Sequence, residues 1–248
     1  MIRVSHDGPV ATITLDRPDR RNALTPDMLG RLAAAIPEAA RASRCLVLAG
    51  AGKVLCAGFD LSLCKDDHSG SVMRSLLAGL SRAVRALREV PVPVVIAAHG
   101  AAIAGGCALL GGGDVVITDD QATLGYPVTR MGISPAVSAP FLRLSIGDAA
   151  CRERLLDSGL ISGADAVRLG LAHESLAGAD DVIPRSLAVA AGLAEKPAGA
   201  MAATKSWLNQ VSPVGTFADA ALGVSLGLAG GPEERSRLAQ LWRPAAAP

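Results

Sequence analysis

Aromatic side chains are scarce in this 248-residue sequence, where Phe, Tyr and Trp make up only 2% of the residues. So few rings make a base-stacking surface for nucleic acid hard to build. A formal net charge of +1 also leaves no field that attracts nucleic acid or an anionic membrane. The composition therefore argues against nucleic-acid binding and predicts a core of Ala, Val, Leu and Ile.

Paired cysteines and an export signal are also missing. The five cysteines are odd in number and form no C-x-x-C pair, so we predict free thiols and no metal site. The first residues, MIRVSHDGPVATITLDRP, pass directly into strand-like alternation, without the basic and apolar regions of a signal peptide. These features predict a cytoplasmic protein.

A membrane span is not expected either, although residues 90–113 contain only one ionisable side chain, that of His99. About 20 apolar residues are enough to cross a bilayer. Six glycines and two prolines interrupt this stretch, however. It is therefore predicted to form a buried strand, a turn and a buried helix.

Strands and helices alternate over the first half of the chain, whose total length suits a single hydrophobic core. Strands are expected at residues 2–5, 10–16, 45–48, 94–98 and 114–117. Helices are expected from Thr25-Pro26-Asp27 to about Ser43 and at residues 72–89. This alternation is typical of an α/β fold with a partly parallel sheet.

Beyond Pro135 the pattern becomes largely helical, with few strand signals. Helix-like segments occupy residues 135–145, 148–158, 164–169, 180–193, 198–209 and 216–229. Prolines at 197, 213 and 232 are expected to separate the last of them. The C-terminal third is therefore predicted to be a helical layer.

Three short motifs resemble catalytic or binding patterns but lack the context those patterns require. Residues 223–227 read G-x-S-x-G, yet both flanks of Ser225 look helical, whereas a nucleophile elbow needs a strand before the serine. Residues 50–53 lack the remaining positions of a phosphate loop, and His173-Glu174 lacks the second histidine of a zincin. We interpret all three as structural.

Two glycine-marked turns that follow predicted strands are the candidate functional features. They are residues 53–61 (KVLCAGFDL) and residues 99–107 (HGAAIAGGC), the second of which opens a helix. Such turns let backbone N–H groups approach a ligand closely, and a helix N-terminus favours an anion. Two N–H groups converging on one point would hold an oxyanion, where one well-aimed donor lowers a barrier by about 2.7–4 kcal/mol. Either turn alone is equally consistent with an ordinary tight turn.

Several ordered motifs resemble those of the enoyl-CoA hydratase/isomerase family, also called the crotonase superfamily. Residues 17–24 (RPDRRNAL) are similar to the family's R-P-x-x-x-N-A-L loop, and residues 56–61 (CAGFDL) to its C-A-G-x-D-L motif. Residues 93–107, followed by Asp114, resemble its strand, second glycine turn and acid. Residues 162–172 resemble its I-x-A-x-E-A…G-L-V stretch. The resemblance spans nearly the whole chain.

The resemblance implies an α/β fold with a crotonase-like ββα spiral core at residues 1–195. Residues 196–248 are then a C-terminal helical trimerisation segment that packs on the core and on a neighbouring subunit. A homotrimer or hexamer is implied, as is an acyl-CoA thioester ligand. Coenzyme A is then part of the substrate, and no separate cofactor is expected.

The resemblance also assigns site residues. The family's oxyanion donors correspond to the backbone N–H groups of Phe59 and Gly105, which would hold the thioester oxygen as an enolate forms. The residues corresponding to the loops that line the CoA moiety are Ala23, Leu24, Ala57, Asp60 and Leu61. Arg21 is positioned in sequence to favour the CoA phosphates.

The sequence departs from the family pattern at both catalytic glutamates. Hydratases of the family carry them in G-G-G-C-E and G-x-P-E, where this chain has Ala108 and Val128. Residues 132–136 lack the aspartate that some members carry. General acid–base catalysis contributes about 10²–10⁴-fold, so ordinary hydration is expected to be weak or absent. Other polar candidates near the pocket by sequence are Asp66, Asp67, His68, Tyr126, Thr129, Arg130, Ser134 and Ser138.

Three hypotheses follow. The chain is a CoA-thioester enzyme whose acid–base group comes from elsewhere, such as His68 or Tyr126. Alternatively, it is a decarboxylase that needs mainly the oxyanion hole, because departing CO₂ generates the enolate without a base. In the third hypothesis it is a non-catalytic acyl-CoA carrier or scaffold.

Overall fold

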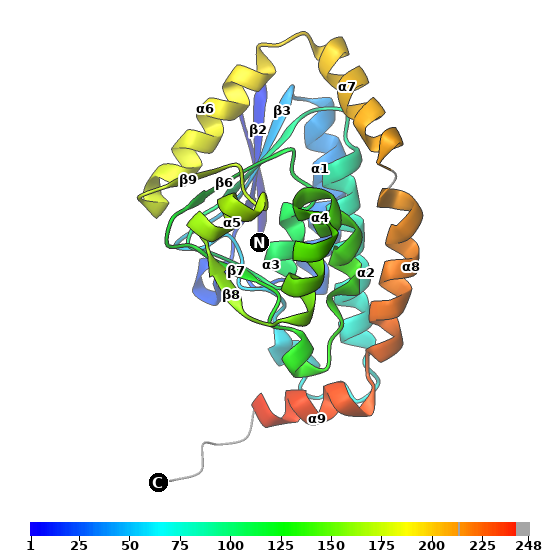
Figure 1. The fold of residues 1–248 in the computed structure, drawn as a ribbon. Coiled ribbons are helices and arrows are strands. Elements are labelled where there is room, and N and C mark those ends of the chain that lie inside the picture. The colour runs from blue at the N-terminus through cyan, green and yellow to red at the C-terminus, as the bar shows by residue number, and fades with distance from the viewer. Residues whose placement is uncertain (213, 242–248) are drawn as a thin grey trace.

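The computed structural model describes residues 1–212 and 214–241, which form two sheets surrounded by helices (Figure 1). The larger sheet has the order β1 (Ile2–Asp7), β2 (Val10–Leu15), β3 (Cys45–Gly50), β4 (Val94–Ala98), β6 (Val115–Asp119) and β9 (Glu174–Leu176). The smaller sheet has the order β5 (Ala101–Ile103), β7 (Thr123–Gly125) and β8 (Leu160–Ser162). The predicted α/β class is therefore correct.

The larger sheet is mostly parallel and divides its side chains between two helical layers. β1 and β2 pair antiparallel, and every other neighbouring pair is parallel. Because side chains alternate along a strand, Val47 and Val95 face one way while Leu48 and Ile96 face the other. The first pair packs with α6 (Val182–Ala194), and the second pair belongs to the larger core cluster.

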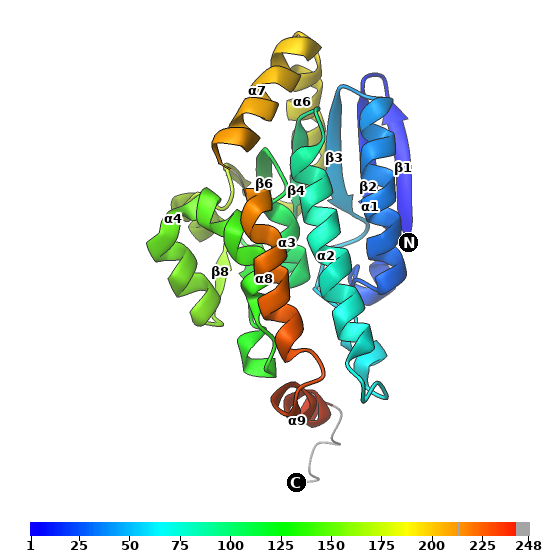
Figure 2. The same ribbon diagram turned by 90° about the vertical axis from the view of Figure 1, so that its right-hand side faces the viewer.

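α1 (Pro26–Arg41) and α2 (Ser71–Glu89) lie side by side on the larger-cluster face of the sheet (Figure 2). The start of α1 follows the predicted capping pattern, because the Thr25 hydroxyl accepts a hydrogen bond of 3.1 Å from the Met28 N–H. Leu29 and Leu32 of α1 and Leu76 and Leu80 of α2 are fully buried or nearly so. The two helices thus close the core from one side.

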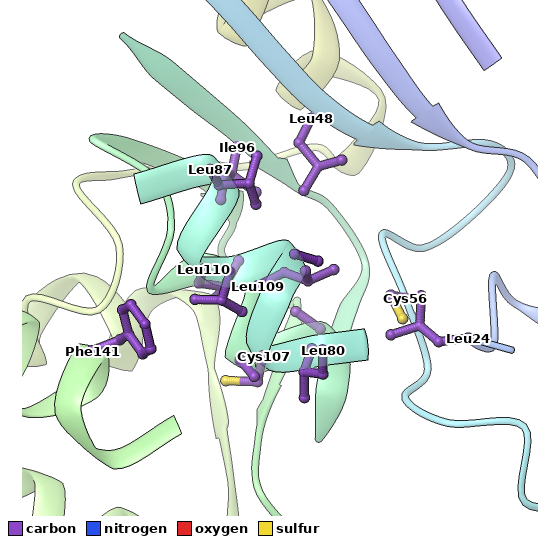
Figure 3. Packing of buried hydrophobic residues seen from close by; sticks show 14 of the residues in the cluster. Leu24, Leu48, Cys56, Leu80, Leu87, Ile96, Cys107, Leu109, Leu110 and Phe141 are labelled. Carbon is purple, nitrogen blue, oxygen red and sulfur yellow. The ribbon is translucent and has the colours of Figure 1, made fainter. Parts of the chain in front are cut away.

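The larger cluster continues from the sheet into α3 (Gly105–Leu110), whose residues are all buried. Figure 3 shows Leu109 and Leu110 of this helix among Leu48, Leu80, Leu87 and Ile96, with Phe141 nearby. Aliphatic side chains dominate this cluster, as the composition predicts. The cluster fixes α3, and with it the second glycine turn, against the sheet.

Several elements differ from the sequence-based expectations. β5 lies inside the predicted turn, and β8 and β9 lie in the part predicted to be helical. Each of these strands has three residues, which is too short to show a period-two pattern. The helices predicted at 135–145 and 148–158 are instead the 3-10 helix η4 (Pro135–Ser138) and α4 (Ala139–Leu156), which is kinked at Gly147.

The C-terminal part is helical, as predicted, with α7 (Ala198–Val211), α8 (Val214–Leu228) and α9 (Pro232–Leu241) after α5 (Gly163–Leu169) and α6. α9 was not predicted, because Pro232 starts this helix as well as ending the preceding segment. Within the described residues, no single helix is long and apolar enough to cross a membrane, although α7 and α8, bent by 55°, pass that test as a pair.

Candidate active site

The two loops that carry the first family motifs lie side by side and are joined by backbone hydrogen bonds. The Leu24 N–H donates to the Gly58 carbonyl at 2.7 Å, and the Asp60 N–H donates to the Leu24 carbonyl at 2.9 Å. The Ala57 N–H donates to the Arg21 carbonyl at 3.0 Å. Residues 17–24 and 56–62 therefore form one surface, which we call the ledge. The ledge contains all six residues that the resemblance assigns to the CoA moiety.

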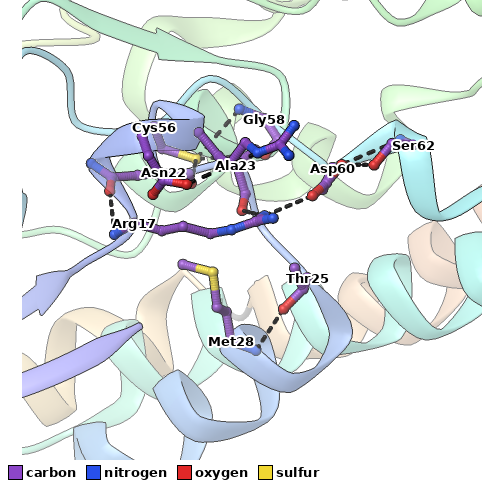
Figure 4. A network of polar contacts seen from close by, with 11 residues as sticks. Arg17, Asn22, Ala23, Thr25, Met28, Cys56, Gly58, Asp60 and Ser62 are labelled. Atoms are coloured by element: carbon purple, nitrogen blue, oxygen red, sulfur yellow. Dashed lines mark hydrogen bonds and ion pairs between the residues drawn. The ribbon is translucent and has the colours of Figure 1, made fainter.

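The Arg17 side chain joins the two loops of the ledge through hydrogen bonds (Figure 4). Its Nη1 atom donates to the Asp60 carboxylate at 2.7 Å and to the Ala23 carbonyl at 3.2 Å. The Ser62 hydroxyl donates to the same carboxylate at 2.5 Å. Burial raises the pKa of Asp60, but the hydrogen bonds from Ser62 and Arg17 outweigh it and hold the pKa below its ordinary value.

Asn22 fixes the neighbouring stretch of the same loop. Its side chain is fully buried, accepts from the Arg17 N–H at 2.9 Å, and donates to the carbonyls of Ala51 and Val54, both at 2.9 Å. Asn22 has a φ of 55°, a left-handed conformation that Asn adopts more readily than most residues. The R-P-x-x-x-N-A-L motif contains Asn22 but does not indicate this role, because its three partners are brought together only by the fold.

The second turn contacts the first directly. A Cβ atom on Gly106 would lie 2.6 Å from the Cys56 carbonyl oxygen, so only glycine fits there. The Ile103 N–H donates to the same carbonyl at 3.0 Å. Ala104 precedes α3 with a φ of 50° and a ψ of −111°, a strained backbone conformation of the kind concentrated at functional sites.

Phe59 and Gly105 line one small pocket at the junction of the two turns. A Cβ atom on Gly105 would lie 2.9 Å from Cε1 of the Phe59 ring. Among the described residues, neither the Phe59 N–H nor the Gly105 N–H has a hydrogen-bond acceptor. The structure therefore brings the two predicted donors to the same pocket, each with a free N–H.

The pocket is small and mostly apolar. Its volume is about 20 Å³, which is room for about one water molecule. Its lining residues are Phe59, Leu77, Leu80, Ala104, Gly105, Tyr126, Val128, Ile133, Ser134, Pro135, Val137 and Ser138. This lining contains no Asp, Glu, His, Lys or Arg. An acyl chain can enter only if side chains of this wall move.

Tyr126 is the most chemically distinctive group in the lining. Its hydroxyl lies beside Cys107 and Ser138, and burial, followed by the influence of Cys107, raises the pKa of Tyr126 well above its ordinary value. Burial also raises the pKa of the Cys107 thiol to about 12. Both groups are therefore neutral at neutral pH, so each can donate a proton or a hydrogen bond but neither serves as a ready base.

The two positions that correspond to the family glutamates differ in location. Val128 is 8% exposed and lines the pocket, so a glutamate there would project into it. Ala108 lies one turn into α3, is 3% exposed and does not line the pocket in its present shape. Neither position supplies a group that transfers protons.

His68 and Asp67 line a different cavity, of about 110 Å³, between the start of α2 and α9. Hydrogen bonds from Ser69 and from the Val72 N–H lower the pKa of Asp67 to about 2, so this carboxylate caps its own loop. The Arg130 guanidinium donates a hydrogen bond to the Ser158 hydroxyl. None of these residues lines the Phe59–Gly105 pocket, so the structure does not bring them to the candidate site.

Ser225 is structural, as predicted, but it also supports the pocket wall. It is buried in the middle of α8, not on a strand-to-helix turn. Its hydroxyl accepts from the Val137 N–H at 3.0 Å and donates to the Ser134 carbonyl at 2.9 Å. The G-x-S-x-G pattern resembles a nucleophile elbow and gives no indication of the contact with Ser134, which is 91 residues away in the sequence.

A family model for enoyl-CoA hydratase/isomerase matches residues 5–217. The chain belongs to this family. It is 33% identical over 219 residues to a Mycobacterium tuberculosis protein named "Probable enoyl-CoA hydratase EchA14", covering 87% of this chain and 84% of that protein. A solved enoyl-CoA hydratase/isomerase from Mycobacterium paratuberculosis superposes with a TM-score of 0.87 at 27% identity, covering 96% of this chain and 97% of that one. The expected crotonase fold is therefore confirmed.

Relatives within this family carry names for different reactions. An Escherichia coli protein named 1,2-epoxyphenylacetyl-CoA isomerase is 34% identical over 138 residues, covering 54% of this chain and 53% of that protein. Membership of the enoyl-CoA hydratase/isomerase family therefore does not fix the reaction, which has to be argued from the pocket.

Proposed function

We propose that this protein binds an acyl-CoA thioester and stabilises its enolate with the backbone N–H groups of Phe59 and Gly105. The observation that carries the proposal is that both N–H groups lack acceptors among the described residues and that Phe59 and Gly105 line one pocket. In an apolar, water-poor pocket such donors act on a developing oxyanion far more strongly than in water. No cofactor besides the CoA of the substrate is required.

The CoA moiety lies, in this proposal, on the ledge of residues 17–24 and 56–62. Arg21 is exposed there and free to meet a phosphate, while Ala23, Ala57 and Leu61 are partly exposed. The side chains of Leu24 and Asp60 are buried, so these two residues shape the ledge and contact the ligand only through their backbone. Asp60 is thus a positioning residue, held by Arg17.

Hydration is not the proposed reaction. Adding water to an enoyl thioester requires a group that moves a proton to or from water within hydrogen-bond reach. Ala108 and Val128 supply none, and the described lining offers only the hydroxyls of Tyr126, Ser134 and Ser138. The free N–H pair without a base favours decarboxylation of a malonyl-type thioester, in which loss of CO₂ leaves the enolate and no base is needed.

A non-catalytic carrier is the second candidate function. It is favoured by the pocket lining, which contains no Asp, Glu, His, Lys or Arg side chain. An enzyme in which Tyr126 donates a proton is the third, since its buried hydroxyl remains protonated over the physiological range. All these candidates bind a CoA thioester, and they differ in the acyl group that reacts and in whether a product forms.

We also propose a homotrimer or hexamer, assembled through residues 196–248, of which 213 and 242–248 lie outside the described residues. A groove of about 920 Å³ runs between α4 and α8. Large apolar side chains are exposed along it and nearby, among them Leu156, Phe217 and Val224, each at least 60% exposed. Contiguous apolar surface of this kind marks an interaction site. A cytoplasmic location remains part of the proposal.

Calorimetry with a panel of acyl-CoA thioesters, followed by product analysis, tests the proposed function. The panel contains a saturated, an enoyl and a malonyl-type thioester, with free CoA as the control. Saturable binding with CO₂ release supports the decarboxylase, and binding without product supports the carrier. Absence of saturable binding to every thioester contradicts the proposal as a whole.

A further inference from the structure

The mostly aliphatic lining of the Phe59–Gly105 pocket contains two buried hydroxyl groups, those of Tyr126 and Ser138. These residues are 4% and 5% exposed, and both line the pocket. Tyr126 directly follows β7, and Ser138 ends η4, so the hydroxyls come from elements other than the two glycine turns. The pocket therefore has a second polar feature besides the pair of N–H groups.

The neighbours of these two hydroxyls are weak hydrogen-bonding partners. The Tyr126 hydroxyl lies beside Ser138 and the Cys107 thiol, and a thiol is both a weak donor and a weak acceptor. In the described part of the chain, neither hydroxyl donates to a carboxylate or to a backbone carbonyl. Hydrogen bonds to an ionised acceptor are roughly twice as strong as neutral ones. A carboxylate in the pocket would therefore attract both hydroxyl protons away from their present neighbours.

The backbone that carries Ser138 is fixed by two other serines. The Ser134 hydroxyl caps η4 by accepting from the Ala136 N–H at 3.2 Å. The Ser225 hydroxyl of α8 accepts from the Val137 N–H at 3.0 Å. Ser138 is thus held in the pocket wall before a ligand arrives, which lowers the entropic cost of using its hydroxyl as a donor.

We propose that the hydroxyls of Tyr126 and Ser138 bind a carboxylate on the acyl group and so select a thioester of malonyl type. This inference rests on the proposed thioester site. The pocket, at about 20 Å³, has room for about one water molecule, so a short acyl group displaces less of its wall than a long one. A short acyl group with a polar end is the kind that this small lining with two hydroxyls fits best.

Neutral donors also suit the loss of CO₂. In that step the bond between the α-carbon and the carboxylate breaks, its electron pair passes into the thioester enolate, and the α-carbon then takes a proton from water. The negative charge moves to the thioester oxygen, where the N–H groups of Phe59 and Gly105 would receive it. A cation beside the carboxylate would oppose this movement, and the described lining contains neither Lys nor Arg.

The test compares two CoA thioesters by calorimetry with the full chain. Sulfoacetyl-CoA carries an anionic sulfonate in place of the carboxylate and cannot release CO₂, and 3,3-dimethylbutyryl-CoA has nearly the same shape without the charge. Tyr126→Phe and Ser138→Ala each remove one hydroxyl. Both variants are expected to bind sulfoacetyl-CoA at least tenfold more weakly than wild type, because each loses a hydrogen bond to a charged group. Both should bind 3,3-dimethylbutyryl-CoA as well as wild type does.

Two further variants separate ligand binding from support of the fold. Thr129→Val is the matched control, because Thr129 follows Val128 in the chain but does not line the pocket, and it should bind both thioesters as wild type does. Ser138→Thr keeps a hydroxyl and should bind sulfoacetyl-CoA more tightly than Ser138→Ala. If Tyr126→Phe does not fold, the two Ser138 variants decide the outcome.

Three results would overturn the inference while the thioester site stands. They are binding of 3,3-dimethylbutyryl-CoA but not sulfoacetyl-CoA by wild type, unchanged sulfoacetyl-CoA binding in the variants that lack a hydroxyl, and equal weakening of both thioesters in those variants. Failure of wild type to bind either thioester would contradict the proposed function itself.

Discussion

Arg17 and Asp60 are 43 residues apart in the sequence, yet their Nη1 and Oδ2 atoms lie 2.7 Å apart and join the two loops of the candidate site. Both side chains are largely buried, so this ion pair is better shielded from water than the others on the surface. The contact fixes Asp60, the residue that follows Phe59 in the first turn, so we expect the geometry of that turn to depend on it.

Arg17→Met should therefore weaken both the fold and the site. It leaves the Asp60 carboxylate with Ser62 as its side-chain partner, and we expect unfolding free energy to fall by about 1.5–3 kcal/mol. Acyl-CoA affinity should fall with it. Arg3→Met is the control, because its pair with Asp16 is exposed and worth less than about 1 kcal/mol. Chemical denaturation and calorimetry measure both effects, and equal losses in the two variants would contradict the assigned role.

Asp60 should also make stability depend on pH in the acidic range. Its folded pKa lies below its unfolded value, so its contribution is fully present above the unfolded pKa of about 3.9 and is lost as pH falls through the folded pKa. Asp60→Asn should remove this part of the acid dependence. The measurement is unfolding free energy against pH for both proteins, and parallel curves would show that the carboxylate is not stabilised by folding.

Gly105→Ala should block the pocket. The new Cβ atom would meet the Phe59 ring at 2.9 Å and Leu24 at 3.2 Å, so the ring must shift from its place in the pocket lining. We expect at least tenfold weaker acyl-CoA binding. Ala104→Gly is the matched control, since it relieves a positive φ beside the same donor and should stabilise the fold by about 1 kcal/mol without loss of affinity. Unchanged binding by Gly105→Ala would rule out this pocket as the thioester site.

Ser225→Ala should loosen the pocket wall. It removes the bonds to the Ser134 carbonyl and the Val137 N–H, at a cost of about 1–3 kcal/mol in stability. Weaker acyl-CoA binding should accompany the lower Tm. Gly223→Ala, at an open position on the same helix, should lower neither. If Ser225→Ala lowers the Tm alone, Ser225 supports the fold and not the site.

Replacing Ala108 and Val128 together with Glu should create measurable hydration of crotonyl-CoA, because the backbone N–H groups of Phe59 and Gly105, our proposed oxyanion donors, lack acceptors among the described residues. The double Gln variant has nearly the same volume but cannot exchange a proton at neutral pH, so it should remain inactive. Stopped assays of crotonyl-CoA loss compare the two. A folded, ligand-binding double Glu variant with no gain over the double Gln variant would show that the pocket geometry is wrong.

The sequence predicted the elements whose pattern is long and locally determined. α1, α2 and β4 end within about two residues of the expected positions because capping and aliphatic runs define them. The three-residue strands and α9 were missed, since their pairing depends on segments distant in the chain. The motifs indicated the candidate site residues, whose roles stay predictions, whereas the buried contacts of Arg17, Asn22 and Ser225 required the fold.

The most direct measurement follows crotonyl-CoA binding and hydration in one purified sample of the full chain. The two free N–H donors without a carboxylate predict saturable binding with a hydration rate close to that of buffer. Hydration at the rate of an efficient enzyme would reveal a base that the described pocket lacks. Absence of saturable binding would contradict the proposed roles of Phe59 and Gly105.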